Sequence, residues 1–486
     1  MSVQEILMDD FSGGVQVGTD PGEFSDRQWS RLDGLVFDGD ERRLRSQWAR
    51  HVLRDTASDA VDLGEVDGVL VLLREEFSAR YRAVPALGSD PGATAWDTAG
   101  LTSGPARVLS KVPERDSGSG GWREGLLLNT VESDGNAWVL TADGSGGVDV
   151  RELTDRYPTD GSQEDAMPHG NVATMWGDFL VLGDIRWTLD DSSAISEENS
   201  ARYPHYLWYS QPGRIDRWDP IDVEPVGNRS GSNRIVGLFP IDIGMVVVST
   251  DSVDLLRGNA AESVPEPLRP DVGCPSSEAC AYWPHVNAVV WVDGDGFVWH
   301  TNGEGVDRLD RPLPGLEGEG LAVTPWGDRL LVRRGDRLWV FQAFAEDGAW
   351  TRVLVDDLPS RMLAADGALY ALGDAGSVWR FDPQHDGGRA AGVTPLVETR
   401  TVGDPHRRIF WHRVGVRWRG SGEPTVARSK AGRGVASYEV PLEVSGSQAV
   451  VRAHGPSYEA SFEVEFDGDV TVESVSVWAH EGRGER

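Results

Sequence analysis

The chain has 486 residues and a formal net charge of −32, because 78 Asp and Glu residues outnumber 46 Lys and Arg residues. This charge argues against a protein that clamps duplex DNA or binds membranes through a polybasic surface, since either task needs a cationic face. The length allows about three domains, or one large β-rich domain and a small one. The 39% hydrophobic content excludes wholesale disorder, and the 58 glycines and 19 tryptophans favour tight turns and flat strand faces.

Residues 1–33 are expected to form an extended N-terminal segment, in which residues 26–32 are the one candidate for a helical turn. The first ten residues have neither a basic segment nor an apolar core, so the sequence predicts no secretory signal. The longest apolar runs, such as residues 69–73 and 245–248, have the length of a strand, whereas a membrane-spanning helix needs about 20 apolar residues. We therefore expect no membrane span.

A short pattern recurs between residues 34 and 390, in which a small turn residue precedes three or four apolar residues. The small residue stands at positions 68, 125, 177, 244, 288, 327 and 367. Several of these runs are followed by a second apolar run, and the clearest of the second runs end at Trp138, Trp299, Trp339 and Trp379. A glycine-bearing turn between two such runs predicts a hairpin. Hairpins that recur about every 40–50 residues are typical of β-propeller blades.

The sequence therefore predicts an all-β protein with a β-propeller of about seven blades over residues 34–390. Each small sheet has two apolar faces, and stacking around an axis buries both. The alternative is a row of β-sandwich domains, which would repeat about every 100 residues. Residues 190–201 are expected as an insertion at a blade edge, and residues 88–104 and 116–121 as solvated loops.

The repeat ends near residues 382–392, and residues 391–486 alternate in a different way. Polar and apolar residues alternate there in four predicted strands, which are residues 409–418, 438–444, 460–466 and 470–478. Several strands in so short a segment indicate a small antiparallel β domain at the C-terminus.

We assign no catalytic, cofactor-binding or metal-ligating residue, and we expect that the protein is not an enzyme. The sequence contains no nucleophile elbow, zinc-protease helix, phosphate-binding loop or dinucleotide fingerprint. His406 and His412 match no ligand motif and are expected at a surface or an interface. Among 78 acidic residues, pairs of carboxylates arise by chance, so they carry no weight as a glycosidase signal.

Three local motifs have a structural and a functional interpretation. Cys274 and Cys280 are either two loop thiols or a small disulfide loop, and their spacing fits no zinc pattern. The segment from Asp293 to Gly296 resembles a calcium loop but lacks its third acid and its final Glu. Residues 374–379 match only the spine of a sialidase-type turn, because Leu372 stands where Ser or Thr belongs, so we expect a tight turn there. Most tryptophans are expected in the core, and stacking on sugar rings is the alternative.

Several blocks of the sequence, in their order, resemble tail nozzle (tail tubular B-like) proteins of short-tailed phages. The resemblance is carried in pieces spread along the chain, and the blocks that carry it are residues 10–15, 21–24, 32–37, 43–46, 207–218, 235–253, 273–297, 460–466 and 470–477. Ser46 and Gln47 depart from the Arg-containing run that ends the first strand of that family. The matched residues are structural, so the resemblance carries over no catalytic position.

The resemblance implies a virion structural protein, which forms a ring of six copies as a tail nozzle or head–tail connector component. Its partners would be copies of itself, other tail or connector proteins, and genomic DNA that passes without specific binding. It would be located in the virion tail after assembly in the host cytoplasm. A carboxylate-rich channel would repel DNA phosphates, in agreement with the charge of −32.

Two alternative functions remain open at this stage. A carbohydrate- or receptor-binding β-propeller would expose several tryptophans together on one rim. A propeller glycoside hydrolase would bring acids with shifted pKa values together in the central funnel.

Overall fold

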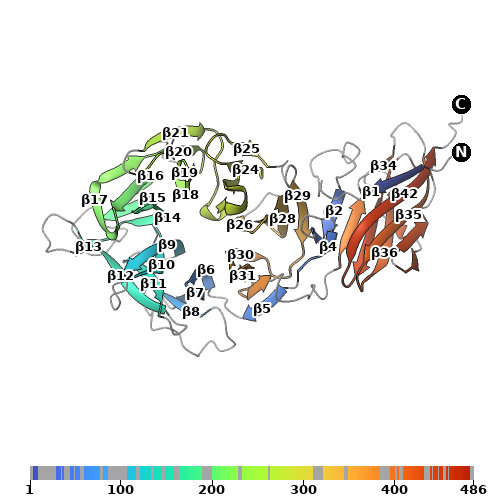
Figure 1. Ribbon diagram of the computed structural model, residues 1–486, viewed down its shortest axis with the longest axis horizontal. Coiled ribbons are helices and arrows are strands. Elements are labelled where there is room, and N and C mark those ends of the chain that lie inside the picture. Colours follow the sequence, from blue (N-terminus) through green and yellow to red (C-terminus); the bar gives the residue numbers. More distant parts are fainter. Residues whose placement is uncertain are drawn as a thin grey trace.

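A computed structural model gives the fold, a ring of small antiparallel sheets with a second β domain at one side (Figure 1). None of the helices in the described part of the chain has the length and apolarity needed to cross a membrane. The structure describes residues 4–8, 29–33, 35–37, 44–48, 50–54, 60–76, 80–85, 107–115, 121–132, 136–143, 148–156, 164–188, 200–227, 233–260, 263–309, 321–343, 348–381, 394–399, 402–403, 409–431, 438–439, 442–446, 448–452, 456–457 and 459–481.

Seven sheets follow one another around the ring and form seven blades, which confirms the predicted propeller. The first strands of the seven blades contact one another in sequence and close a circle around the axis. These first strands are β6 (Ala60–Val66), β9 (Arg107–Arg115), β14 (His169–Trp176), β18 (Ile235–Ile241), β22 (Cys280–Trp283), β26 (Ala322–Trp326) and β30 (Pro359–Ala365). The second strands are β7 (Val69–Glu76), β10 (Trp122–Asn129), β15 (Phe179–Thr188), β19 (Gly244–Ser249), β23 (Ala288–Val292), β27 (Arg329–Arg334) and β31 (Ala368–Gly373).

The remaining strands complete the blades towards the outer rim. The third strands are β8 (Arg80–Pro85), β11 (Ala137–Ala142), β16 (Ser200–Gln211), β20 (Val253–Arg257), β24 (Val298–Thr301), β28 (Arg337–Ala343) and β32 (Val378–Phe381). The second to sixth blades continue with β12 (Val148–Arg156), β17 (Arg214–Pro225), β21 (Val264–Arg269), β25 (Asp307–Arg308) and β29 (Gly348–Val353), and β13 (Glu164–Ala166) adds a fifth strand to the second blade.

The apolar runs found in the sequence lie in the second strands of the seven blades, and each of these strands begins within three residues of its marker residue. The turn before β31 shows why the marker is small. Asp366 and Gly367 both have positive φ values, 49° and 78°, which is the conformation of the tight turn that matches the strand twist. The runs ending in tryptophan are the third strands, and Trp379 in β32 is fully buried.

The ring is closed by a strand from the other end of the chain. The seventh blade consists of β30, β31, β32 and then β5 (Arg50–Arg54), in which Val52 pairs with Trp379. Joining the N-terminal side of the propeller to its last blade ties both ends of the repeat together and covers the edge of β32.

The second domain contains two packed sheets built from both ends of the chain. One sheet has the order β3-β4-β42-β35-β39-β38, with β1 paired to β42 and β40 paired to β35. Its strands are β1 (Gln4–Met8), β3 (Leu35–Phe37), β4 (Leu44–Ser46), β35 (Ile409–Arg419), β38 (Leu442–Ser445), β39 (Gln448–Arg452), β40 (Pro456–Ser457) and β42 (Thr471–Glu481). The other sheet contains β2 (Trp29–Asp33), β33 (Leu396–Thr399), β34 (Val402–Gly403), β36 (Glu423–Ala431), β37 (Tyr438–Glu439) and β41 (Glu459–Asp467).

Strands are present in all four segments predicted near the C-terminus, whereas the prediction of a helical turn near residue 30 is wrong. Residues 29–33 form β2, and Leu32 is fully buried in the shared core described below. Strands β3 and β4, which fall within the predicted propeller range of 34–390, belong with β42 in the second domain. Three-residue strands leave no alternation in the sequence, so pattern could not identify their partner.

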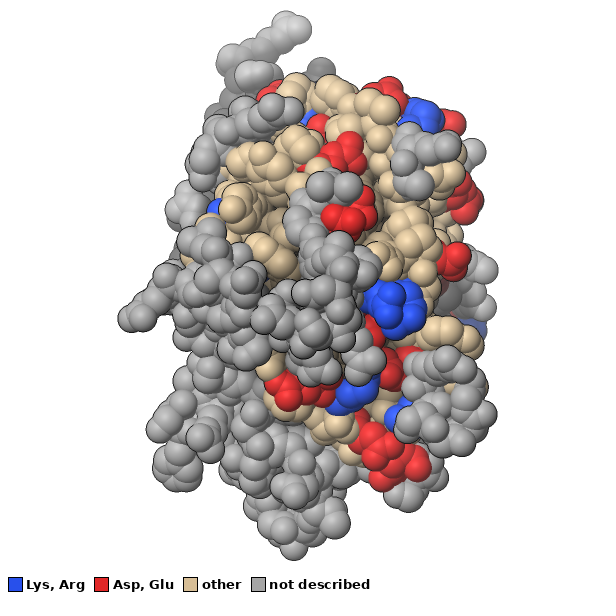
Figure 2. Space-filling view, turned by 90° about the vertical axis from the view of Figure 1, so that its left-hand side faces the viewer, with Lys and Arg blue, Asp and Glu red and all other residues tan. Residues whose placement is uncertain are grey.

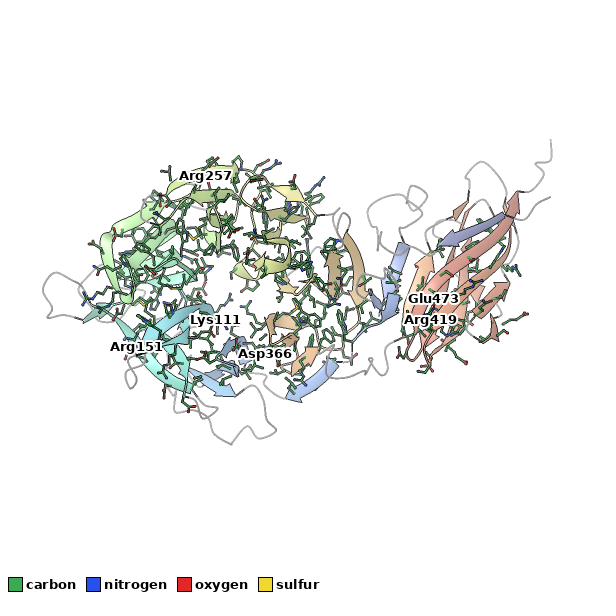
Figure 3. The ribbon with its side chains drawn as sticks, viewed as in Figure 1. Lys111, Arg151, Arg257, Asp366, Arg419 and Glu473 are labelled. Carbon is green, nitrogen blue, oxygen red and sulfur yellow. The ribbon has the colours of Figure 1, made fainter. Side chains whose placement is uncertain are left out.

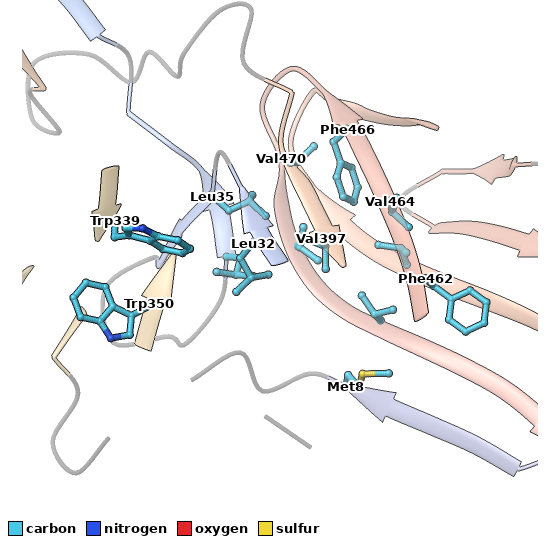
Figure 4. Close-up of a cluster of buried hydrophobic side chains, with 14 of the residues drawn as sticks. Met8, Leu32, Leu35, Trp339, Trp350, Val397, Phe462, Val464, Phe466 and Val470 are labelled. Atoms are coloured by element: carbon cyan, nitrogen blue, oxygen red, sulfur yellow. The ribbon is translucent and has the colours of Figure 1, made fainter. Parts of the chain in front are cut away.

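The second domain and the sixth blade share one hydrophobic core (Figure 4). Trp339 and Trp350 of the sixth blade belong to the same cluster as Leu32, Val397 and Phe462 of the second domain. A single parallel backbone pairing, between Asp33 and Arg352, joins β2 to β29. The two domains are therefore held together by continuous apolar packing.

The predicted loop at residues 88–104, all but residue 121 of the loop at 116–121, residues 190–199 of the insertion at 190–201, and the predicted boundary at 382–392 lie outside the described residues, as does His406.

Candidate functional site

The axis of the propeller holds a cavity of about 220 Å³, called the central cavity here. Its lining comes from the first strands of six blades, namely β6, β9, β14, β18, β22 and β30, and from the 3-10 turn η3 (Ser277–Ala279) that leads into β22. Such a position is where propellers and other closed folds place ligands, so we take it as the candidate site.

Four charged side chains meet at the central cavity and form the central ion cluster, Asp62, Arg107, Glu278 and Arg361. The Arg361 Nη1 atom lies 2.6 Å from Glu278 Oε1, and its Nε atom lies 3.5 Å from Asp62 Oδ1. Arg107 donates to the same Glu278 oxygen. These four residues come from the first, second, fifth and seventh blades, so the cluster connects blades across the axis.

Asp62 is also held by the backbone. Its two carboxylate oxygens accept the N–H groups of Leu63 and Val108, each at 2.9 Å. The second of these bonds joins the first blade to the second. Asp62 is thus fixed by two strands as well as by Arg361.

The charges of the central ion cluster balance, and each carboxylate has a cationic partner. Burial opposes ionisation of Glu278, but Arg361 and Arg107 outweigh it and lower its pKa to about 2. Burial raises the pKa of Asp62, and Arg361 with the two backbone N–H groups offsets this only in part. Burial also disfavours the charge of Arg361, yet Asp62 and Glu278 raise its pKa. Buried ions are tolerated when they are paired in this way.

The Glu278 carboxylate is poorly suited to acid–base catalysis. A general acid needs a pKa near the working pH and a proton it can release to substrate. Glu278 is ionised and shared by two guanidinium groups, while the Asp62 side chain is 10% exposed and holds two backbone N–H groups. The cluster is arranged to hold blades together.

A second and larger hollow of about 710 Å³ lies beside β22, β26 and β30. Tyr282, His285, Pro325, Met362 and Leu363 are among the residues that line it. No carboxylate or guanidinium group belongs to this lining, so this hollow differs in chemistry from the central cavity.

The motifs singled out in the sequence have structural roles. Asp374 pairs with Arg333 of the sixth blade, whose Nη1 atom lies 2.8 Å from Asp374 Oδ1 and 2.6 Å from the Pro359 carbonyl oxygen. Trp379, in the same turn region, packs in the core between the sixth and seventh blades. The expectation of a tight turn with a packed tryptophan is met.

The segment from Asp293 to Gly296 forms a turn in which the Asp293 carboxylate already accepts two hydrogen bonds. Asp293 accepts the Phe297 N–H at 2.8 Å and the Trp299 indole N–H at 2.7 Å. The described residues contain no group of three His, Cys, Asp or Glu side chains placed to hold a metal ion. Cys274 and Cys280 are free, buried thiols, and His412 lies in β35.

Most tryptophans lie in the core, as expected. Those fully buried are Trp218, Trp283, Trp291, Trp350 and Trp379. Trp122, at 65% exposure, is the exposed one among the tryptophans whose side chains the structure describes. The described residues therefore lack the cluster of exposed tryptophans that a sugar-binding rim requires.

Sequence reasoning missed the central ion cluster, although the repeat holds a signal for part of it. Asp62 and Arg361 each stand six residues before a marker, at 68 and 367. Asn171 and Leu238 occupy the same repeat position before markers 177 and 244, and all four line the central cavity. In these four blades, the position six residues before the marker therefore faces the axis, and a charged residue at that position lines the axis.

No protein-family model matches the sequence, and no curated protein matches it. Among solved structures, the chain is similar to BamB from Moraxella catarrhalis, with 13% identity, a TM-score of 0.40, and coverage of 72% of this chain and 96% of that chain. It is also similar to YCF48 bound to D1 peptide, with 11% identity, a TM-score of 0.39, and coverage of 74% of this chain and 99% of that chain. At these identities the likeness concerns the β-propeller fold alone.

Proposed function

We propose that the protein is a non-enzymatic structural component of a tailed-phage particle, a tail nozzle or head–tail connector protein that assembles with copies of itself into a ring. The ordered sequence blocks that resemble tail nozzle proteins suggest this function. The observation that carries it is an exposed arginine face on the second domain of a chain with a charge of −32.

The arginine face is the outer side of β35, made of Arg413, Arg417 and Arg419. These three residues are exposed and alternate with Val414, Val416 and Trp418, which are buried in the core. Figure 3 shows Arg419 beside Glu473 on the second domain, and these two side chains form an ion pair. In the described part of the chain, neither Arg413 nor Arg417 has a carboxylate within ion-pair distance.

An aromatic ring completes the arginine face. The Arg413 guanidinium lies 4.3 Å from the centre of a Trp478 ring. Trp478 lies across Gly415, where a Cβ atom would come within 2.7 Å of the indole.

An acidic edge lies on the far side of the propeller, on β17 of the third blade. Asp219 and Asp222 are near enough that the charge of Asp219 adds to burial in raising the pKa of Asp222. Acidic side chains are spread over this side of the molecule, which faces away from the second domain (Figure 2). The arginine face of one copy and the β17 edge of the next are therefore complementary in charge.

Such a contact joins two different surfaces and is heterologous, so it generates a closed ring when the rotation between copies divides a full turn. The central ion cluster places paired charges of both signs on the axis of each propeller, and in this proposal the DNA channel lies between copies. A ring of six copies, other tail or connector proteins as neighbours, and DNA passing an acidic wall without specific binding complete the proposal.

The experiment measures the native mass of the purified protein by sedimentation and by native mass spectrometry. We expect a closed oligomer that Arg413→Glu with Arg417→Glu dissociates, because it places acid against acid. Adding Asp219→Arg with Asp222→Arg to the same chain should restore the oligomer. The control is Arg257→Glu, which alters an exposed arginine on the rim of the propeller (Figure 3) and should leave the mass unchanged.

A wild-type protein that remains monomeric at high concentration would refute the ring. An oligomer whose native mass is unchanged by both charge reversals would refute the contact described here. Binding of duplex DNA that is lost in the Arg413→Glu, Arg417→Glu protein would assign the arginine face to nucleic acid instead.

A further inference from the structure

The two cysteines bracket the turn that supplies Glu278 to the central ion cluster. Cys274 comes four residues before Glu278 and Cys280 two residues after it, so η3 lies between the two thiols. Both thiols are buried, with exposures of 0% and 7%. Any bond between them would close a loop of seven residues around Glu278.

The two sulfur atoms converge on one backbone oxygen. The Cys274 thiol donates to the Ser276 carbonyl oxygen at 3.2 Å, and the Cys280 Sγ atom lies 3.9 Å from the same oxygen. The Cys280 thiol also lies 3.6 Å from the carbonyl oxygens of Ser277 and Val236. Both sulfur atoms are thus gathered around one carbonyl oxygen inside one short loop.

The residues around the two thiols leave only Cys280 accessible, and only from the side of the central cavity. Gly237 of β18 lies against Cys280, where a Cβ atom would come within 2.7 Å of Sγ. Cys280 also lines the central cavity together with Glu278. A small oxidant can therefore approach Cys280 from the axis, while Cys274 is enclosed by the apolar cluster of the fourth and fifth blades.

We propose that Cys274 and Cys280 form a reversible disulfide that fixes the turn carrying Glu278. The oxidant is a small-molecule disulfide such as oxidised glutathione. The Cys280 thiolate attacks one sulfur of the oxidant, which breaks its S–S bond and releases one thiol. The Cys274 thiolate then attacks the mixed disulfide at Cys280 and releases the second thiol. Two electrons and two protons pass from the cysteines to the oxidant.

We expect the two thiols to be oxidised slowly. Contact with Cys274, followed by burial, raises the pKa of the Cys280 thiol, and the attacking species is the thiolate. Oxidation should therefore be slow at neutral pH and should accelerate by up to tenfold for each pH unit below that pKa. The inference does not depend on the proposed ring.

The test uses the full-length protein, oxidised glutathione and alkylation under denaturing conditions, followed by mass spectrometry. In the reduced protein both cysteines should be alkylated. After oxidation neither should be alkylated, the peptide should be lighter by two hydrogens, and dithiothreitol should restore both thiols. The oxidised protein should also unfold at a higher temperature, because the closed loop restricts the unfolded chain.

Matched variants separate an internal disulfide from other products. Cys274→Ser should stop at a glutathione adduct on Cys280, whereas Cys280→Ser should leave Cys274 free, because only Cys280 faces the cavity. Two thiols that stay alkylatable after oxidation at pH 8.5, or cysteines linked between chains, would overturn the inference. Oxidation that occurs only in urea would overturn it as well, because the folded geometry would then play no part.

Discussion

Glu278→Gln gives the sharpest test of the central ion cluster, because it keeps the size of the side chain and removes its charge. In the wild-type protein, burial opposes ionisation of Glu278, but Arg361 and Arg107 prevail and lower its pKa from an ordinary 4.5 to about 2. The Glu278 side chain is 19% exposed, so solvent screens the pairs weakly. The difference in pKa corresponds to about 3 kcal/mol of folding free energy.

The sign of the pH dependence follows from the direction of this change. Because the pKa in the folded protein lies below the ordinary value, the contribution of Glu278 is complete above about pH 5 and is lost as the pH falls towards 2. We expect Glu278→Gln to unfold with about 3 kcal/mol less free energy at pH 7. The deficit should shrink towards pH 2, where the wild-type carboxyl group is also protonated.

Equilibrium urea unfolding, followed by tryptophan fluorescence between pH 7 and pH 2, measures both quantities. The control is Glu266→Gln, which removes a half-exposed partner of Arg257 and should change the free energy of unfolding by no more than about 0.5 kcal/mol. Equal stability of wild type and Glu278→Gln at pH 7 would refute the pairing. A deficit that stays constant down to pH 2 would show that the loss has a cause other than charge.

Three further changes probe other contacts. Arg333→Ala removes the group that joins the sixth blade to Asp374 in the seventh, and urea unfolding should show a loss of about 3 kcal/mol; an unchanged midpoint would contradict this role. Burial raises the pKa of Asp254 from 3.8 to about 6, so ionisation costs stability as the pH rises through this range. Asp254→Asn should therefore stabilise the fold at pH 7 by up to about 3 kcal/mol and give no gain at pH 3.5, as thermal unfolding at the two pH values can check. Deleting residues 1–46 removes β1 to β4, and limited proteolysis should then cut within residues 409–481; a resistant fragment would show that the C-terminal strands fold without them.

The arrangement of the two domains bears on the proposed ring. Strands from both ends of the chain build the second domain, and its core continues into the sixth blade through Leu32 and Trp350. A load on the arginine face would therefore pass into the propeller through packed side chains. A chain with this construction can hold a fixed angle between its two contact surfaces, which a closed ring requires.

The local parts of the fold could be predicted from the amino-acid pattern alone. The markers predicted seven hairpins, and the alternation of residues 460–466 predicted β41, because these strands pair with near neighbours or alternate in a regular way. The same patterns left the partner of every distant strand open. Polar motifs such as the turn at Asp374 were correctly read as structural because turn chemistry is also local.

The contacts between distant segments, in contrast, emerge only from the folded molecule. The pairing of β5 with β32 joins residues more than 300 positions apart, and Asp62 meets Arg361 across a similar interval. The pairing of β5 with β32 leaves no periodic trace in the sequence, because closing a ring depends on the number and curvature of all the blades between. The repeat position of Asp62 and Arg361 indicates that both face the axis, but it does not indicate which charges meet there, and only the assembled circle of strands determines that.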